Sequence, residues 1–431
     1  MSDGTKRFLL TMWDGGGTVP PELGVARRLV EHGHAVHILG DPTLGSGAAA
    51  AGCTFSAWQR APHRTSQNPS QDILKDWEAT NPLVMLRLVR DLFLVGPAEA
   101  FAADTAEAIA RFQPDVVLSD YMLLGCIIAA QAARLPVVSI MPNVWMVPSK
   151  GSPAIGPGFP PAKGFAGRVR DAAMIAATNR LFKGGVKPLN EVRAAHALAP
   201  LTSFYDQILR TDRILVLTSA AFDFAAPTVP DNVRYIGPIL DTPAWAEPWI
   251  DRPAPPSAPL VLVAFSSTYQ QQAPVLQRIV DALATLPVRA VVTLGQQLPP
   301  GATRGAENVL VVPSAPHDQI LAEASLAITH CGHGTTMKAL AAGVPMVCIP
   351  MGRDQNDTAA RVVHHDAGVR LSPKASTANI RKAVEKVLAD PRYRQGATLL
   401  ARRLADENPT ETLINELAEL DALSPAPPYT G

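Results

Sequence analysis

The chain has 431 residues, 47% of them hydrophobic, and it carries 38 Lys and Arg residues against 38 Asp and Glu residues. A chain of this length is too long for one ordinary core, so we expect a globular protein of two domains. The balanced charge, without a basic block interleaved with aromatic residues, predicts that nucleic acid is not a partner.

Targeting signals and metal-binding patterns are absent from the sequence. The apolar run at 8–12 is too short for a signal peptide, and no stretch approaches the roughly 20 apolar residues of a membrane span. The cysteines lie far apart, without a C-x-x-C pair, and they are Cys53, Cys126, Cys331 and Cys348. This usage predicts buried thiols in a cytoplasmic protein, with neither a zinc site nor a disulfide framework.

The first half of the chain opens with a strand at 7–13, a glycine-rich turn at 14–21, a helix at 23–31 and a strand at 36–39. Such a β-loop-α-β unit is the usual beginning of a Rossmann-like domain. Later segments add helices at 83–94, 99–111 and 169–197 and strands at 115–119, 137–141 and 214–218. The strands are almost continuously apolar, as expected of parallel strands covered on both faces.

Two Pro-rich segments interrupt this alternation. Residues 147–170 are dense in Pro and Gly and predict a loop over a cleft. After the run 234–238, which we expect to leave the first sheet, prolines recur from Pro243 to Pro259 and predict a stiff linker.

The second half repeats the alternation with strands at 260–265, 289–294, 309–312, 326–329 and 346–349, followed by amphipathic helices at 378–388 and 395–420. The predicted fold is therefore α/β, with two Rossmann-like domains facing a cleft. The expected division is a first domain at 1–240, a linker at 241–259, a second domain at 260–400 and a C-terminal helix and tail at 401–431.

A glycine loop between a strand and a helix is the strongest chemical signal. Gly332 and Gly334 allow backbone amides to approach a ligand closely, and the positive end of the following helix favours an anion. His330 can donate to a phosphate oxygen, and Thr335 offers a hydroxyl. After the next strand, Asp354-Gln355 supplies a carboxylate and an amide suited to neighbouring sugar hydroxyls. The set therefore suits a diphosphate that carries a sugar.

This order of residues resembles the nucleotide-sugar signature of family-1 glycosyltransferases, the UDP-glucuronosyltransferase-like enzymes of GT-B fold, and among them the bacterial natural-product type. The resemblance implies that His330, Gly332, Gly334 and Thr335 bind the diphosphate. It assigns sugar binding to Asp354 and Gln355.

Further donor contacts are implied by the same resemblance. Ser314, Ala315 and His317 correspond to the segment that faces the base, and Ser267 lies in a small-residue turn beside the phosphates. Lys338 departs from the family, which usually has a Glu there that accepts the ribose hydroxyls. A Lys is only a donor and can reach a phosphate or a carboxylate instead.

The first loop departs from the family at its general base. Inverting members carry a His three residues before a Pro and orient it with an Asp from a later strand. Here Thr18 stands at the His position, whereas Asp120 matches the orienting Asp. Three repairs are open: Asp120 takes the proton directly or through a water held by Thr18, Asp14 takes it, or the acceptor is acidic enough to need little help.

The expected activity is therefore inverting transfer of a hexose from a UDP- or dTDP-sugar, a co-substrate, to a hydroxyl of a small lipophilic acceptor. No cofactor is expected, and the absence of a D-x-D motif predicts metal independence. The first alternative is a non-catalytic protein that binds nucleotide sugars but lacks the usual base. A second, less favoured because acidic and basic groups around the sugar are not apparent, is a nucleotide-sugar epimerase.

Overall fold

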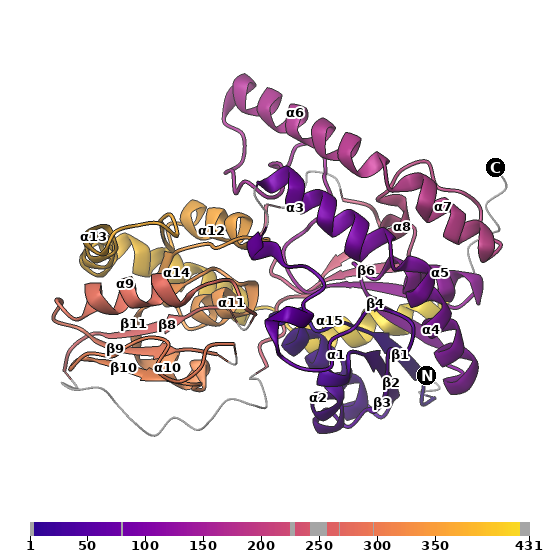
Figure 1. Cartoon of the computed structure of the whole chain (residues 1–431), viewed down its shortest axis with the longest axis horizontal. Coiled ribbons are helices and arrows are strands. Elements are labelled where there is room, and N and C mark those ends of the chain that lie inside the picture. The colour runs from indigo at the N-terminus through magenta and orange to yellow at the C-terminus, as the bar shows by residue number, and fades with distance from the viewer. Residues whose placement is uncertain are drawn as a thin grey trace.

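Two parallel β-sheets organise the molecule (Figure 1). The computed structural model describes residues 4–78, 81–224, 229–241, 257–266, 268–295 and 297–422. Most of the expected linker, including its prolines from Pro243 to Pro256, lies outside these residues, and so does Ser267.

The first sheet has seven parallel strands in the order β3-β2-β1-β4-β5-β6-β7. They are β1 (Arg7–Thr11), β2 (Ala35–Gly40), β3 (Thr54–Ala57), β4 (Val116–Asp120), β5 (Val137–Met141), β6 (Arg213–Val216) and β7 (Val233–Tyr235). Side chains alternate between the two faces, so Leu9 joins one apolar core while Phe8 and Leu10 join the other. Both faces are thus buried, as the apolar runs predict.

The second sheet has six parallel strands in the order β10-β9-β8-β11-β12-β13. They are β8 (Leu260–Ala264), β9 (Arg289–Thr293), β10 (Val309–Val312), β11 (Ala324–Thr329), β12 (Met346–Cys348) and β13 (Gly368–Arg370). Val261 and Val263 again pack on one face, and Leu260 and Leu262 pack on the other. The expectation of two Rossmann-like α/β domains is confirmed.

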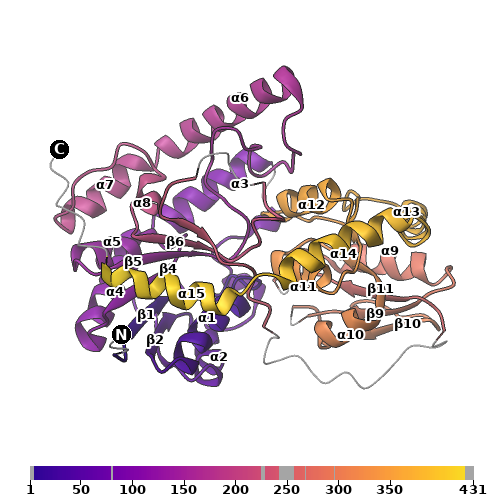
Figure 2. The same ribbon diagram turned by 180° about the vertical axis from the view of Figure 1, so that it is seen from behind.

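Helices cover both sheets (Figures 1 and 2). Those of the first domain are α1 (Val19–Glu31), α2 (Gly45–Ala50), α3 (Pro82–Leu88), α4 (Ala98–Phe112), α5 (Leu124–Ala132), α6 (Gly164–Lys183), α7 (Val186–Ala195) and α8 (Asp206–Leu209), with 3-10 turns η1 (Pro42–Leu44), η2 (Pro69–Gln71) and η3 (Asp76–Glu78). Those that follow are α9 (Ala273–Leu283), α10 (His317–Glu323), α11 (His333–Ala341), α12 (Gln355–His364), α13 (Thr377–Ala389), α14 (Pro391–Ala405), α15 (Pro409–Ala418) and η5 (Glu419–Ala422). Among the described residues, none of these helices combines the length and apolar character that crossing a bilayer requires.

Short edge strands and helix ends differ from the sequence prediction. The run at 234–238 was expected to leave the first sheet, but its first residues belong to β7, which pairs with β6. The edge strands β3 and β13 were not predicted from the sequence. Strands of three or four residues are too short to show a clear alternation. The helix expected at 83–94 changes after α3 into a π-helix, η4 (Val89–Val95).

The C-terminal helix expected at 395–420 is two helices, because the chain breaks at Asn408-Pro409. The Asn408 side chain accepts a hydrogen bond from the Glu411 amide and caps α15. Leu413 and Leu417 of α15 are buried in the core of the first domain, and Figure 2 shows the helix crossing back to it. The domain limits drawn from the sequence stay a prediction.

Candidate active site

The carboxyl ends of the strands in both sheets face one cavity of about 1960 Å³. Every expected donor-binding residue that the structure describes lines it, from both sides of the glycine loop: Ser314, Ala315, His317, His330, Gly332, Gly334, Thr335, Lys338, Asp354 and Gln355. Thr18 and Asp14 of the first domain line the same cavity, whereas Asp120 does not.

The glycine loop holds His330 at the start of α11. A Cβ on Gly332 would lie 2.5 Å from Nε2 of His330, so a larger residue there would displace the imidazole. Burial lowers the pKa of His330 to about 4, and the ring is therefore neutral near pH 7 with a single N–H to donate. Its Nδ1 forms no hydrogen bond of ordinary geometry with a described residue, although the backbone of Ala264 is close enough to oppose the fall in pKa.

The helix behind this loop begins at His333, directly after Gly332. The first intrahelical bond of the cap runs from the Thr336 amide to the Gly332 carbonyl. The amides of His333, Gly334 and Thr335 consequently belong to the first turn, where helices leave their N–H groups without a backbone acceptor. These donors can bind an anion.

Lys338 and His317 lie further along the same cavity. Lys338 is partly buried and forms no hydrogen bond or ion pair with a described residue; burial lowers its pKa, while Asp318 and then Asp241 oppose that shift. Burial lowers the pKa of His317 to about 4, and its Nε2 lies 3.1 Å from Oγ1 of Thr293. A cation is thus available beside a neutral imidazole.

Asp354 and Gln355 differ in what they offer to a ligand. The Gln355 Oε1 accepts hydrogen bonds from the amides of Met351 (2.7 Å) and Gly352 (3.1 Å), and its Nε2 donates to Oε1 of Gln270 (3.0 Å). Its amide therefore shapes the loop. Burial raises the pKa of Asp354, and a hydrogen bond from the Asn143 side chain is among the effects that lower it.

Asp120 ends β4, as expected, but an indole covers it. The Trp13 Nε1 donates to Oδ2 at 3.1 Å and the Met122 amide donates to Oδ1 at 2.8 Å. Burial raises the pKa of Asp120, and the side chains of Glu22 and Trp13 lower it by hydrogen bonding. Trp13 lines the cavity and packs on Phe93, with ring centroids 4.3 Å apart.

Glu22 is a buried neighbour of Asp120 that was not singled out from the sequence. Its side chain is fully buried, and burial followed by the neighbouring Asp120 charge raises its pKa well above the usual range. Neither carboxylate oxygen has another hydrogen-bond partner among the described residues. A buried acid pair holds a shared proton in preference to two charges. The available signal was an acidic residue directly after Pro21, in the first turn of a helix.

The other two residues of the first loop have different environments. The Asp14 Oδ2 accepts hydrogen bonds from Oγ1 of Thr43 and Nε2 of Gln67, both at 2.7 Å. Gln67 in turn accepts from Nε2 of Gln297 at 3.0 Å and so connects the two domains. The Thr18 Oγ1 is buried without a partner among the described residues.

The sequence matches the protein family described as UDP-glucoronosyl and UDP-glucosyl transferase over residues 97–416. The chain belongs to this family. It is 26% identical over 426 residues to 4'-demethylrebeccamycin synthase of Lentzea aerocolonigenes, covering 96% of this chain and 98% of that protein.

Solved structures show the same fold. The calicheamicin glycosyltransferase CalG4 superimposes with a TM-score of 0.76 at 21% identity, covering 97% of this chain and 99% of that one. The glycosyltransferase VinC, solved in complex with DTDP, superimposes with a TM-score of 0.67 at 17% identity, covering 97% and 100%. The protein is therefore a hexosyltransferase with the GT-B fold, as the resemblance implied.

Contacts between the domains of this glycosyltransferase hold the Pro- and Gly-rich loop beside the candidate donor-binding residues. Asp357 in α12 accepts hydrogen bonds from the amides of Gly156 (2.6 Å) and Gly158 (3.1 Å). Arg361, one turn later, pairs with Asp223 of the first domain through Nε at 2.7 Å. The loop predicted to cover a cleft is thus fastened to the second domain.

His333 of the glycosyltransferase forms another such contact, which the sequence did not reveal. Its Nε2 lies 2.8 Å from Oγ1 of Thr218, which follows β6. Burial lowers the pKa of His333 to about 4, so the imidazole is neutral near pH 7. The first turn of α11 is consequently held against the first domain.

Metal-ligand groups and cysteines complete the description of the site. Within the described ranges, no group of three or more His, Cys, Asp or Glu side chains is arranged to hold a metal. Metal independence nevertheless stays a prediction. Cys126, Cys331 and Cys348 are buried free thiols, as expected, and Cys53 is partly exposed.

Proposed function

We propose that the enzyme transfers a hexose from a UDP- or dTDP-sugar to a hydroxyl of a small lipophilic acceptor, with inversion at the anomeric carbon. The observation that carries this proposal is one cavity that combines anion-binding groups at the start of α11 with apolar walls from the first domain. Inversion follows if the acceptor oxygen attacks the face opposite the departing diphosphate in a single displacement.

The donor diphosphate would lie at the glycine loop. His330 supplies one neutral N–H, and the amides of His333, Gly334 and Thr335 supply further donors. Such preorganised donors stabilise the negative charge that develops on the leaving diphosphate without rearrangement. The DTDP bound to the structurally similar VinC supports a nucleoside diphosphate as the ligand class.

The sugar would lie between the domains, beside Asp354. Asn143, which follows β5, reaches Asp354 from the first domain, and its Oδ1 has no partner among the described residues. A carboxylate and an amide placed together suit adjacent sugar hydroxyls, because one accepts and the other can donate. Gln355 would act by holding the loop that carries Asp354.

The acceptor would lie against the first domain. Apolar side chains from α3, η4 and α6 line that part of the cavity, and they include Met85, Leu86, Val89, Met174, Leu181 and Phe182. Ligand pockets bury most of the surface of their ligand and use few polar groups for orientation. This lining therefore favours a lipophilic aglycone over a sugar or a peptide.

Asp120 is the proton acceptor that we assign within this proposal. The bond from the acceptor oxygen to the anomeric carbon forms as the bond from that carbon to the diphosphate oxygen breaks. The acceptor proton passes to Asp120, directly or through a water held by Thr18. Because Trp13 separates Asp120 from the cavity, its indole must shift for this transfer. Asp14 is already occupied by Thr43 and Gln67.

The test is product formation with panels of nucleotide sugars and lipophilic acceptors, measured by mass spectrometry. We expect a donor-dependent glycoside, with Asp120→Asn lowering kcat much more than donor affinity and His330→Ala lowering both. The absence of both product and nucleotide binding would refute the proposal. Equal and mild effects of the two substitutions would refute the assigned roles.

A non-catalytic nucleotide-sugar-binding protein is the second candidate, and one observation favours it. The indole N–H of Trp13 donates a hydrogen bond to Asp120 Oδ2, in the place where the family's base histidine would be oriented by this carboxylate. Calorimetry separates the two candidates. Donor binding without glycoside formation from any acceptor in the panel would favour the binding protein.

A further inference from the structure

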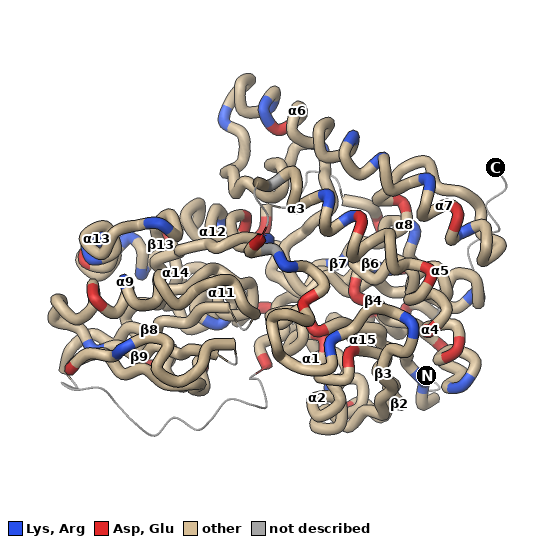
Figure 3. Tube along the Cα trace, in the orientation of Figure 1, with Lys and Arg blue, Asp and Glu red and all other residues tan. Residues whose placement is uncertain are grey.

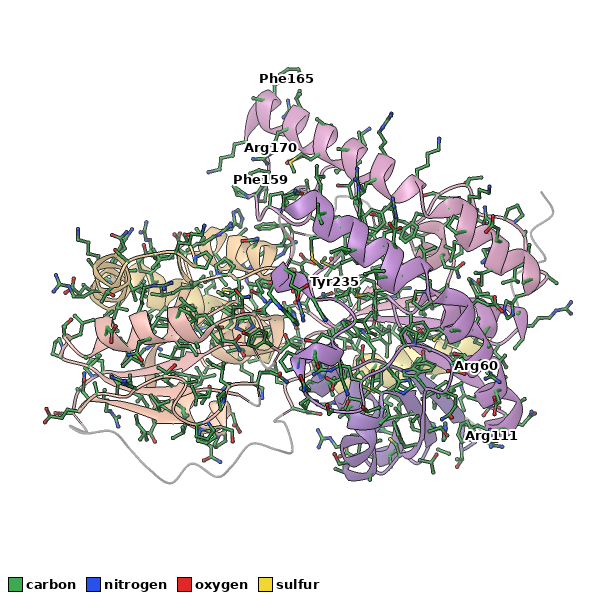
Figure 4. All side chains as sticks on the ribbon, in the orientation of Figure 1. Arg60, Arg111, Phe159, Phe165, Arg170 and Tyr235 are labelled. Atoms are coloured by element: carbon green, nitrogen blue, oxygen red, sulfur yellow. The ribbon has the colours of Figure 1, made fainter. Side chains whose placement is uncertain are left out.

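The helix α6 is exposed along most of its 20 residues, and only Asp171 and Phe182 are buried. The side chain of Phe165 is 76% exposed and that of Val169 is 49% exposed. In Figures 1 and 2 the helix projects from the first domain, above α3. Figure 4 shows Phe165 at its outer end, pointing away from the molecule. Such exposure of a large aromatic side chain is unfavourable in water.

The exposed apolar side chains of α6 form one stripe. Phe165, Val169, Ala172 and Ala176 follow each other at intervals of four, three and four residues, which places them on one face of the helix. All four are exposed. The opposite face lines the cavity with Met174, Ala177, Thr178 and Leu181. The outer stripe is therefore distinct from the acceptor pocket.

Basic residues accompany the stripe. Arg168, Arg180 and Lys183 are exposed and form no hydrogen bond or ion pair with a described residue. The single acidic residue of α6 is Asp171, which is buried and paired with Arg170. Figure 3 accordingly shows blue segments along the helix and one red segment. The outer face thus combines apolar contact area with an uncompensated positive charge.

The neighbouring helix extends this surface to the cavity. Leu83 of α3 is 60% exposed and also lines the cavity, and Leu92 of η4 is 50% exposed. Four of the six large exposed apolar side chains in the described residues therefore belong to α3, η4 and α6. The apolar cavity reaches the molecular surface beside this group.

We propose that the outer face of α6, together with Leu83 and Leu92, docks on an anionic lipid bilayer. The stripe from Phe165 to Ala176 would enter the boundary between headgroups and acyl chains, and Arg168, Arg180 and Lys183 would contact anionic headgroups. Helices that lie in the plane of a membrane combine these two features. Water alone supplies neither apolar contact for the stripe nor negative charge for the basic residues, whereas an anionic bilayer supplies both. Docking would place the cavity mouth at Leu83 against the source of a lipophilic molecule.

Vesicle binding tests this proposal without donor or acceptor, so its outcome is independent of the proposed reaction. The full chain is floated with vesicles of phosphatidylcholine and phosphatidylglycerol, and with vesicles of phosphatidylcholine alone. We expect binding to the anionic vesicles that weakens as salt is added. Arg168→Gln with Arg180→Gln should lower the partition coefficient by on the order of ten-fold, and Phe165→Ser with Val169→Ser should also reduce it strongly.

A matched control lies on the second domain. Leu399 of α14 is 53% exposed, and Arg402 on the same helix is exposed. Leu399→Ser with Arg402→Gln removes one apolar and one basic exposed side chain and should leave vesicle binding unchanged. Equal binding to neutral and anionic vesicles, binding to neither, or equal losses from the control and the α6 variants would overturn the proposal. Circular dichroism of each variant confirms that it folds.

Discussion

The indole Nε1 of Trp13 donates a hydrogen bond to Oδ2 of Asp120 at 3.1 Å. This contact lies where the strand ends of the first sheet approach the cavity. It stabilises the ionised carboxylate and at the same time covers it. Thr18 stands where the family resemblance implies a histidine, and Trp13 is a hydrogen-bond donor to Asp120 in this chain. The protonation state of that carboxylate therefore depends on Trp13.

Trp13→Phe tests this dependence, because phenylalanine keeps the packing on Phe93 and removes the N–H donor. Without that donor the pKa of Asp120 rises further. We expect the acidic limb of the kcat profile to move to higher pH by about one unit. The stability of the variant should change little. An unchanged limb would show that Asp120 is not the group that titrates in catalysis.

Glu22→Gln tests the buried acid pair. The pKa of Glu22 is raised in the folded state, so the folded protein binds this proton more tightly than the unfolded chain. Its contribution is favourable at low pH and is lost as pH rises toward the folded pKa. Glutamine does not titrate. We therefore expect Glu22→Gln to gain stability relative to the parent as pH rises from about 5 to about 9, measured by urea unfolding. A difference in unfolding free energy between parent and variant that stays constant over this pH range would contradict the raised pKa of Glu22.

His333→Gln tests the buried neutral imidazole against Thr218. The folded pKa of His333 is lowered from 6.5 to about 4, so the unfolded chain takes up the proton first as pH falls. As pH falls from about 6.5 to about 4, this group should lower the free energy of unfolding of the parent by roughly 2–3 kcal/mol. The variant should not show this loss. Thermal unfolding over this range measures the difference. His32→Gln, at an exposed position, controls for the removal of a histidine.

Gly158→Ala tests the loop that bridges to α12. Gly158 has φ +68°, and a Cβ there would lie 2.2 Å from the Asn356 carbonyl oxygen. We expect the loop to lift from α12 and kcat/KM to fall by roughly ten-fold or more, since small misplacements in a site are costly. Gly164→Ala is the control, because it has φ +81° but open space around a Cβ. Equal losses in both variants would assign the effect to backbone strain instead of the bridge.

The two-domain fold could be predicted from the sequence for physical reasons, and so could the gathering of the candidate donor-binding residues around one cavity. Buried parallel strands are continuously apolar, and the loop from His330 to Thr335 carries its anion-binding groups within a few consecutive residues. Residues that are adjacent in the sequence remain adjacent in the folded protein, so such local patterns can be recognised in advance. Gly332 and His330 lie two residues apart, so their proximity follows from the sequence alone.

The first-domain side of the cavity was harder to predict, because its decisive contacts join residues far apart in the sequence. Trp13 and Asp120 are separated by 107 positions, and nothing near Trp13 indicates that its N–H faces a carboxylate. Glu22 looked like a favourable acidic residue in a first helical turn. Its pairing with Asp120 and the bridge between Asp357 and Gly158 depend on how strands and domains pack together.

A crystal structure with dTDP or UDP bound tests the central claim most directly. We expect the diphosphate at the start of α11, with oxygens within hydrogen-bond distance of His330 and of the Gly334 and Thr335 amides. The empty space beside Asp354 and Asn143 should be large enough for a hexose. A nucleotide bound outside this cavity, or one whose diphosphate makes no contact with His330 and α11, would contradict the account.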